Sequence, residues 1–221
     1  MPLRPGMVIT RSAYILPDTY FLPTDSSPDT AALIIEGENI VIDFQGAVLV
    51  GDTIATQPDA FKGLGILVRT GQNIILKNVH IRGYQTGIMA TGIESLQISD
   101  CDLSYNYRQE IGSNREREDV ADGLSFHQNE QDEWLRYGAG IYLKNCAGAQ
   151  VDNCRVSGGQ NALMLSGCNE GLFFNNEFTF NSGIGIGLYR SSRNRILHNR
   201  LDWNVRDSHP PSPRGQASAG L

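Results

Sequence analysis

Long apolar runs are absent from this sequence of 221 residues. No stretch approaches the roughly 20 consecutive apolar residues that a membrane-spanning helix needs. The N-terminal segment, MPLRPGMVITRSAYIL, also lacks the apolar core of a secretory signal peptide. We therefore expect no membrane partner, and no export signal is visible in this chain.

Signatures of metal and nucleic-acid binding are scarce as well. The sequence has four cysteines and four histidines, but no CxxC motif or paired histidines of the kind that metal sites use. Asp119 and Asp122 could offer carboxylates to calcium, yet no EF-hand spacing supports this. The formal net charge of −6 disfavours nucleic acid and anionic membranes as partners. We expect no metal and no cofactor, and calcium stays an unsupported alternative.

What the sequence does have is a repeat of about 22 residues. Three columns of apolar residues recur with the same spacings of 22, 53, 22 and 23 residues. The interval of 53 equals one repeat of 22 plus an insertion of 31 residues. A short period without a long helical pattern indicates a solenoid, in which each repeat stacks on the previous one. The columns are Leu76, Ile98, Val151, Phe173 and Ile196; Ile81, Leu103, Val156, Phe178 and Leu201; and Ile66, Ile88, Ile141, Leu163 and Ile186.

One repeat, residues 73–92, contains three short runs in which apolar and polar residues alternate. Alternation with a period of two predicts strands, and the Asn and Gly residues between the runs suit sharp corners. Three strands and three corners make one coil of a parallel β-helix, whose coils lie about 4.8 Å apart. We predict an all-β solenoid of about six coils, which is long enough to bury a continuous core.

The corner and strand motifs carry a family resemblance. The first corners read LKNVHI, ISDCDL, VDNCRV, FFNNEF and ILHNRL, and the third strands read GIMA, GIYL, ALML and GIGL. Over residues 31–206 these resemble the right-handed parallel β-helix repeats of the pectin-lyase-like superfamily. The resemblance implies a right-handed helix, an extracellular or periplasmic location, and ligands that lie along the third-strand face.

The repeat also divides the chain. We expect residues 1–50 to form entry strands and a cap, residues 51–206 to form the coils with an inserted loop at 106–137, and residues 207–221 to be a truncated or frayed tail. We further expect the protein to be a monomer.

The four cysteines fall into two columns. Cys101 and Cys154 are 53 residues apart, and Cys146 and Cys168 are 22 apart, so each pair lies on neighbouring coils. They can stack as small apolar residues. If the chain is exported, a disulfide between coils remains open.

A set of asparagines follows the second strands. Asn106, Asn181 and Asn204 each come three residues after a position of the second column. We expect their side chains to cap equivalent corners by hydrogen bonding to the backbone.

Alternation also predicts which third-strand side chains point outward. None of them is a carboxylate, so an acid for catalysis would have to come from the insertion, where Asp119, Asp122, His127, Asp132 and Glu133 are candidates. The outward set is Leu67, Arg69, Met89, Thr91, Tyr142, Lys144, Met164, Ser166 and Tyr189, followed by Arg190 at the corner.

These residue types fit β-elimination from a uronic acid better than hydrolysis. A base removes the proton beside the carboxylate while a cation stabilises the enolate, and hydrolysis would need two carboxyl groups. We predict catalytic roles for Lys144, Tyr142, Asp122 and His127. The predicted substrate-binding residues are Arg69, Trp134, Tyr189 and Arg190, although a role as a loop anchor in the core is favoured over sugar stacking for Trp134.

The sequence thus supports two hypotheses. The first is an enzyme that acts on a polysaccharide, lyase-like or hydrolase-like and on an acidic glycan. The alternative is a non-catalytic carbohydrate-binding or structural β-helix, which the missing strand carboxylates favour. Convergence of Asp122, His127 or Asp132 on Lys144 or Tyr142 would favour the enzyme.

Overall fold

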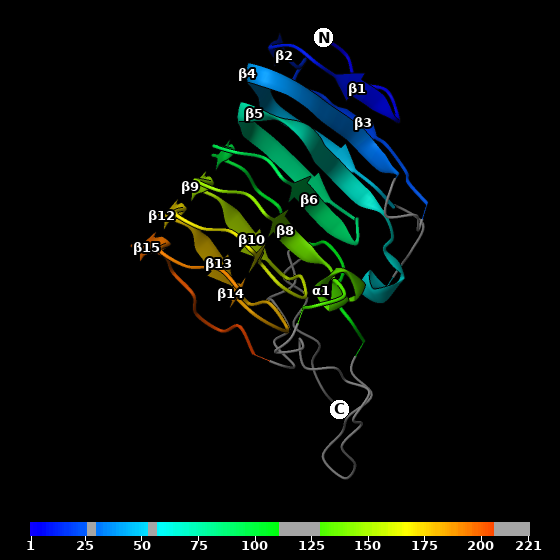
Figure 1. The fold of residues 1–221 in the computed structure, drawn as a ribbon. Coiled ribbons are helices and arrows are strands. Elements are labelled where there is room, and N and C mark those ends of the chain that lie inside the picture. Colours follow the sequence, from blue (N-terminus) through cyan, green and yellow to red (C-terminus); the bar gives the residue numbers. More distant parts are fainter. Residues whose placement is uncertain (26–29, 53–56, 111–128, 206–221) are drawn as a thin grey trace, which may run out of the picture.

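The protein is a stack of coils built almost entirely from parallel strands (Figure 1). The computed structural model describes residues 1–25, 30–52, 57–110 and 129–205. Every strand pairing within these residues is parallel. The predicted fold, a right-handed parallel β-helix, is confirmed.

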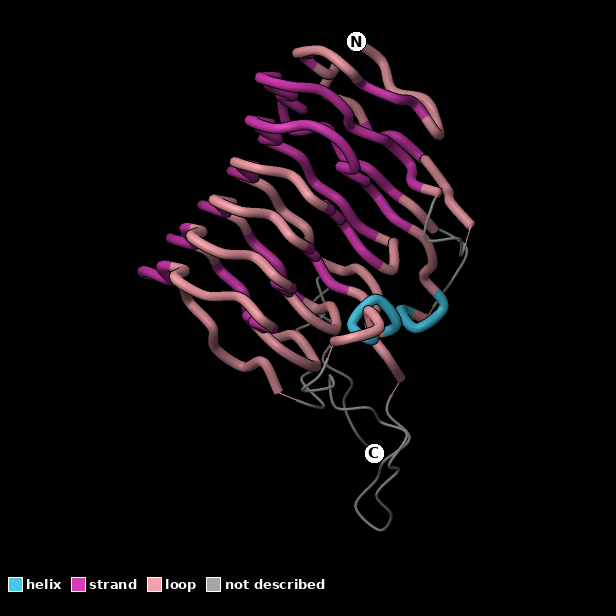
Figure 2. The backbone as a smooth tube through the Cα atoms, viewed as in Figure 1, coloured by secondary structure: helices cyan, strands magenta, loops and turns pink. Residues whose placement is uncertain are grey.

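Two long strands dominate the first half of the stack. Strands β4 (Ala31–Val50) and β5 (Leu64–Arg82) each run around a whole coil, and they pair along almost their entire length (Figure 2). The short strands β1 (Met7–Ile9), β2 (Ala13–Tyr14) and β3 (Thr19–Phe21) pair with three successive parts of β4. The N-terminal residues therefore form a coil on one side of β4.

The later coils are made of shorter strands. The third strands are β6 (Thr86–Thr91), β8 (Ala139–Lys144), β11 (Leu163–Ser166) and β14 (Ile186–Tyr189), and they stack in that order on β5. The first strands are β7 (Gln97–Ser99), β9 (Gln150–Asp152), β12 (Leu172–Phe174) and β15 (Arg195–Leu197). The second strands of two coils are β10 (Arg155–Ser157) and β13 (Glu177–Thr179). Two helical turns, η1 (Pro58–Ala60) and α1 (Glu133–Arg136), lie in the loops.

The register of the strands follows the sequence columns. Ile66 pairs with Ile88, Ile88 with Ile141, Ile141 with Leu163, and Leu163 with Ile186. The first-strand column pairs in the same way from Leu76 to Ile196. Like residues therefore stack on like residues along the core, which is the arrangement that the 22-residue period predicts.

The first corners depend on the left-handed backbone conformation. One residue in each of five consecutive coils has a φ between 52° and 58°, a region that Asn and Asp tolerate better than most other residues. In addition, the Asn78 side chain donates a hydrogen bond of 2.9 Å to Asp43 on the preceding coil. The corner residues are Asn78, Asp100, Asn153, Asn175 and His198.

The asparagine ladder, which consists of Asn106, Asn181 and Asn204, caps the corners after the second strands. Asn181 Nδ2 donates to the carbonyl oxygen of Val156 on the preceding coil at 3.1 Å, and its Oδ1 accepts from the N–H of Gly159 at 3.1 Å. Asn106 and Asn204 make equivalent bonds to the backbone on their own coils and the preceding ones. The predicted capping role is confirmed.

The interior is apolar and closed except at the last coil. The cysteines lie inside as buried free thiols, stacked in the expected pairs. On the last described coil, Leu188, Ile196 and Leu201 are partly exposed although they stand at core positions. The core is therefore best covered in the middle of the stack, beneath the third strands that carry the candidate site.

Candidate functional site

The outward side chains of the third strands form two columns with different properties. Alternation along each strand puts one column near its start and the other near its end. The outer apolar column is Leu67, Met89, Tyr142, Met164 and Gly187. The outer polar column is Thr91, Lys144, Ser166 and Tyr189, and Arg69 extends it, since Arg69 directly follows Val68, the last residue of β5 that pairs with β6.

The end of the insertion covers the outer apolar column. Trp134 of α1 packs edge-on against Tyr142 and Tyr189, with ring centroids 6.5 and 6.1 Å apart. Met164 beneath it is fully buried, and Trp134 and Tyr142 are only 4% and 2% exposed. The Trp134 ring thus anchors the insertion to the strands, and neither ring presents a face to solvent.

Polar groups of the insertion meet the strands beside this anchor. Asn129 Nδ2 donates to the Tyr142 hydroxyl at 2.8 Å, and that hydroxyl donates to Asp132 Oδ1 at 3.0 Å. Lys144 Nζ donates to Asp132 Oδ2 at 2.5 Å, and the backbone N–H of Trp134 donates to Asn129 Oδ1 at 2.9 Å. An acid of the insertion therefore lies within hydrogen-bond reach of both Lys144 and Tyr142.

The Tyr142 hydroxyl is a neutral donor at physiological pH. Burial raises the pKa of Tyr142 to about 12, and the nearby Asp132 carboxylate also raises it, against the hydrogen bond from Asn129. A phenol with so high a pKa is a poor base near neutral pH. Its contact with Asp132 holds the carboxylate in place.

Asp132 reaches Lys144 because of an unusual backbone conformation. Its φ of 58° and ψ of 35° are left-handed, a conformation that Asp adopts more readily than most residues other than glycine and Asn. It also precedes α1 at the N-cap position, but its side chain forms no capping hydrogen bond. The carboxylate is instead turned to the strands, where it forms an ion pair that is about one-third exposed on each side, at 32%.

The other cations of the third-strand face are also paired with acids. Arg69 Nε on β5 lies 2.5 Å from Glu36 Oε1 on β4, one coil before it. At the opposite end, Arg190 contacts Glu130 at 2.9 Å, and the Tyr189 hydroxyl donates to the same carboxylate at 3.2 Å. The Arg190 guanidinium also lies over the Tyr189 ring, 5.2 Å from its centroid. The Arg190 pair is more exposed than the Lys144 pair on both sides, whereas in the Arg69 pair only the arginine is more exposed.

The structure thus brings together some of the residues singled out in the sequence. Lys144 and Tyr142 meet Asp132, Tyr189 contacts the buried Trp134, and Arg69 lies two coils away from Lys144 in the same column. Asp122 and His127, like Asp119, lie outside the described residues. The catalytic and substrate-binding roles assigned to these residues stay predictions.

Asn129 and Glu130 take part in the site although sequence reasoning gave them no role. Glu130 carries a negative charge, as a partner of Arg190 must, and it precedes Asp132 by two residues in the insertion. Its proximity to Arg190 has no signal in the sequence, because the insertion has no repeat that would fix its register. The same holds for the contact between Asn129 and Tyr142.

Fold and site together define a right-handed parallel β-helix with a loop packed on its third-strand face. The chain belongs to the NosD family, since residues 25–210 match the family model described as periplasmic copper-binding protein (NosD). A comparison with curated proteins finds no match.

Two solved structures resemble the chain at low identity. A protein from Parabacteroides merdae, provisionally described as a glycosyl hydrolase, is 15% identical with a TM-score of 0.37, over 90% of this chain and 82% of that one. The A-module of the mannuronan C-5 epimerase AlgE6 from Azotobacter vinelandii is 11% identical with a TM-score of 0.39, over 90% of this chain and 56% of that one. Such distant likenesses carry no argument about the activity of this chain.

Among the described residues, no helix is long and apolar enough to cross a membrane.

The described residues do not fit a copper centre. Copper prefers imidazole, thiolate and thioether ligands, but no three His, Cys, Asp or Glu residues gather within the described ranges. The neighbouring Cys168 thiol and burial raise the pKa of Cys146, and Cys101 and burial likewise raise that of Cys154. The hydrogen bond with Cys146 lowers the pKa of Cys168, so the two thiols of this pair favour at most one thiolate, and a single thiolate is not a ligand set for copper.

Proposed function

We propose that this chain is a periplasmic or extracellular β-helix that binds an acidic polysaccharide along its outer polar column. One observation carries the proposal. Cations recur on alternate coils at or beside this column, with Arg69 directly after Val68 of β5, Lys144 two coils later, and Arg190 at the corner after Tyr189, two coils after that. The family description, which places the NosD protein in the periplasm, supports the location.

The spacing of these cations suits a chain of sugars. Coils lie about 4.8 Å apart, so cations on alternate coils are separated by roughly 9 to 10 Å along the axis. In an extended uronan with a near two-fold twist, every second carboxylate points to the same side at a distance of this order. Thr91 lies on the coil between Arg69 and Lys144 and is partly exposed, so it can offer a hydroxyl group to the intervening sugar, whereas Ser166 on the next such coil is buried.

The ion pairs on this face are compatible with exchange. Exposed pairs contribute only about 0–1 kcal/mol, so a ligand carboxylate can replace the protein's own at little cost. Arg190 and Glu130 are both mostly exposed, at 69% and 61% of their side-chain surfaces. Lys144 is more firmly held, because its partner Asp132 also accepts a hydrogen bond from Tyr142.

Calorimetric titration with acidic and neutral oligosaccharides of equal length tests this function. We expect oligogalacturonate to bind and the neutral galactan not to, with affinity that falls as salt is added. Lys144→Gln should weaken binding by about tenfold, the loss of one charge-assisted contact. Lys77→Gln is a matched control, because Lys77 pairs with Asp43 on a first strand, away from the column. Equal binding of acidic and neutral sugars would refute the proposal.

A second candidate function is β-elimination on the same glycan. The contact of Asp132 with Lys144 and Tyr142 favours it, because the reaction needs a base beside a group that stabilises the enolate. The Asp132 carboxylate would take the proton beside the substrate carboxylate, the Lys144 ammonium would stabilise the enolate, and the neutral Tyr142 hydroxyl would protonate the departing glycosidic oxygen. New unsaturated sugar ends, detected by ultraviolet absorbance and lost in Lys144→Gln, would establish this activity. Binding without such products would leave the non-catalytic function.

A further inference from the structure

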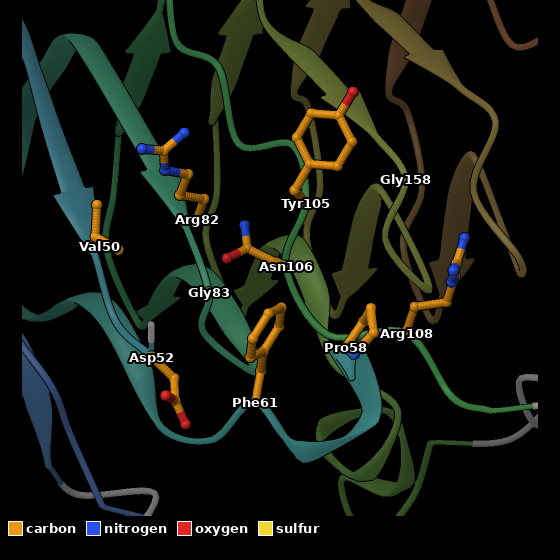
Figure 3. Close-up of a pocket in the computed structure, with 10 residues that line it drawn as sticks. All are labelled: Val50, Asp52, Pro58, Phe61, Arg82, Gly83, Tyr105, Asn106, Arg108 and Gly158. Carbon is orange, nitrogen blue, oxygen red and sulfur yellow. The ribbon is translucent and has the colours of Figure 1, made fainter. Parts of the chain in front are cut away.

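A pocket of about 410 Å³ lies apart from the third-strand face, where second strands end and loops begin (Figure 3). Val50 and Arg82 are paired residues at the ends of β4 and β5, and the Tyr105 carbonyl on the next coil accepts a hydrogen bond from the Gly83 N–H. Pro58 and Phe61 of the loop that contains η1 close the opposite side. The pocket therefore lies across several successive coils.

The walls of the pocket are fixed to one another by the backbone. The Arg108 N–H donates to the carbonyl oxygen of Pro58 at 3.3 Å, which ties the η1 loop to the following coil. The Tyr105 N–H donates to Ser157 on the coil beyond at 2.8 Å. A pocket whose walls are joined in this way is largely formed before a ligand arrives, which lowers the entropic cost of binding.

The side chains combine aromatic rings with cations. In Figure 3 the rings of Phe61 and Tyr105 lie on opposite sides of the pocket, and Arg82 and Arg108 flank them. Tyr105 is 41% exposed, so its ring is open to a ligand. Arg108 takes part in further interactions within the protein. Arg82 is exposed and forms no ion pair with any residue that the structure describes, so Arg82 is the cation that can receive an anionic ligand.

We propose that this pocket binds a single sugar ring that carries a carboxylate, as a second carbohydrate site separate from the outer polar column. Guanidinium groups match the geometry of a carboxylate with two parallel hydrogen bonds. Aromatic rings pack on the C–H faces of sugars, and Asp52, which also lines the pocket, has carboxylate oxygens that can accept hydrogen bonds from hydroxyl groups. The site does not depend on Lys144, so it can exist whether or not the outer polar column binds a glycan.

Saturation-transfer NMR and titration with the monosaccharides galacturonate and galactose test the pocket. We expect galacturonate to bind and galactose to bind at least about tenfold more weakly. Arg82→Gln should reduce galacturonate binding by about tenfold, and Tyr105→Ala should reduce its saturation transfer. Arg155→Gln is the matched control, an exposed arginine on a second strand outside the pocket. Thermal unfolding of each variant verifies that it folds.

Three outcomes would overturn the proposal. Equal affinity for galactose and galacturonate would remove the role of the carboxylate. Inorganic phosphate that competes as well as galacturonate would make the pocket a general anion site. Loss of monosaccharide binding in Lys144→Gln but not in Arg82→Gln would move the site to the outer polar column, and would leave the function proposed above intact.

Discussion

At the scale of single residues, the asparagine ladder shows how side-chain amides complete the backbone bonding of the coils. Asn181 joins the backbone of the preceding coil to Asn204 on the next one, and it is fully buried. Removal of its amide would leave buried N–H and C=O groups without partners, which is costlier than loss of an exposed hydrogen bond. The ladder therefore links the coils more strongly than its small side chains suggest.

We expect Asn181→Ala to lower the free energy of unfolding by about 1–3 kcal/mol. Equilibrium unfolding in urea measures the change. The control is Asn175→Gly at an exposed first corner with a φ of 55°, where glycine tolerates the conformation and should change stability by less than about 1 kcal/mol. Equal losses in the two variants would contradict the role of the ladder.

The ionisation of Tyr142 reports whether the insertion covers the Tyr142 ring. Burial raises the pKa of Tyr142 to about 12 in the folded protein, against about 10 in an unfolded chain. A raised tyrosine pKa contributes stability that is fully present below pH 10 and is lost as the pH rises towards 12. Tyrosine ionisation can be followed by ultraviolet absorbance in the wild type and in Tyr142→Phe. The difference between the two titration curves is the ionisation of Tyr142, which should occur near pH 12. Ionisation near pH 10 would mean that the insertion does not cover this ring.

At the scale of elements, α1 is held to the third strands by few contacts. The helix has only four residues, too few to be stable alone. Its position depends on Trp134, on the hydrogen bonds of Asn129 and Asp132, and on Gln85, whose Nε2 donates to the carbonyl oxygens of Leu135 and Arg136. A short element of this kind can detach without unfolding of the coils.

Trp134→Ala should therefore release the insertion locally. Truncation of a buried tryptophan costs about 3–5 kcal/mol, so hydrogen exchange at Leu135 and Tyr137 should accelerate while β8 stays protected. Trp203→Ala is the control, because Trp203 is 65% exposed on the last described coil. Unchanged exchange in α1 would show that other contacts hold the helix.

At the scale of the whole molecule, stability depends on where a residue lies along the stack. Ile141 and Ile186 belong to one core column, but Ile141 is fully buried while Ile186 is only partly buried, on the last described third strand. We expect Ile141→Ala to cost about 2–5 kcal/mol and Ile186→Ala clearly less. Thermal and urea unfolding of the two variants makes the comparison. Similar losses would contradict the gradient of burial.

The fold could be predicted from the sequence because the repeats can be aligned with one another, and equivalent positions then show which residues stack. Columns such as Ile66 to Ile186 determine the strand register, and the spacing of Asn106, Asn181 and Asn204 identifies the capping positions. The handedness came from the family resemblance, since spacing alone does not distinguish the two hands.

The site was less predictable. Alternation correctly separates inward from outward positions on β8, but it does not reveal that α1 buries the outward Tyr142. The insertion has no repeat, so the contacts of Asn129 and Asp132 depend on tertiary packing alone. The pocket beside Arg82 likewise arises from a loop that lies between two coils.

The most direct test of the proposed function uses the length of the ligand. In an Arg82→Gln background, which removes the pocket's main cation, oligogalacturonates of increasing length can be titrated by calorimetry. If the outer polar column binds the chain, affinity should rise with length until the oligomer reaches from Arg69 to Arg190, and Lys144→Gln should weaken the long oligomers by about tenfold. Affinity that does not change with length or with the loss of Lys144 would contradict the proposal.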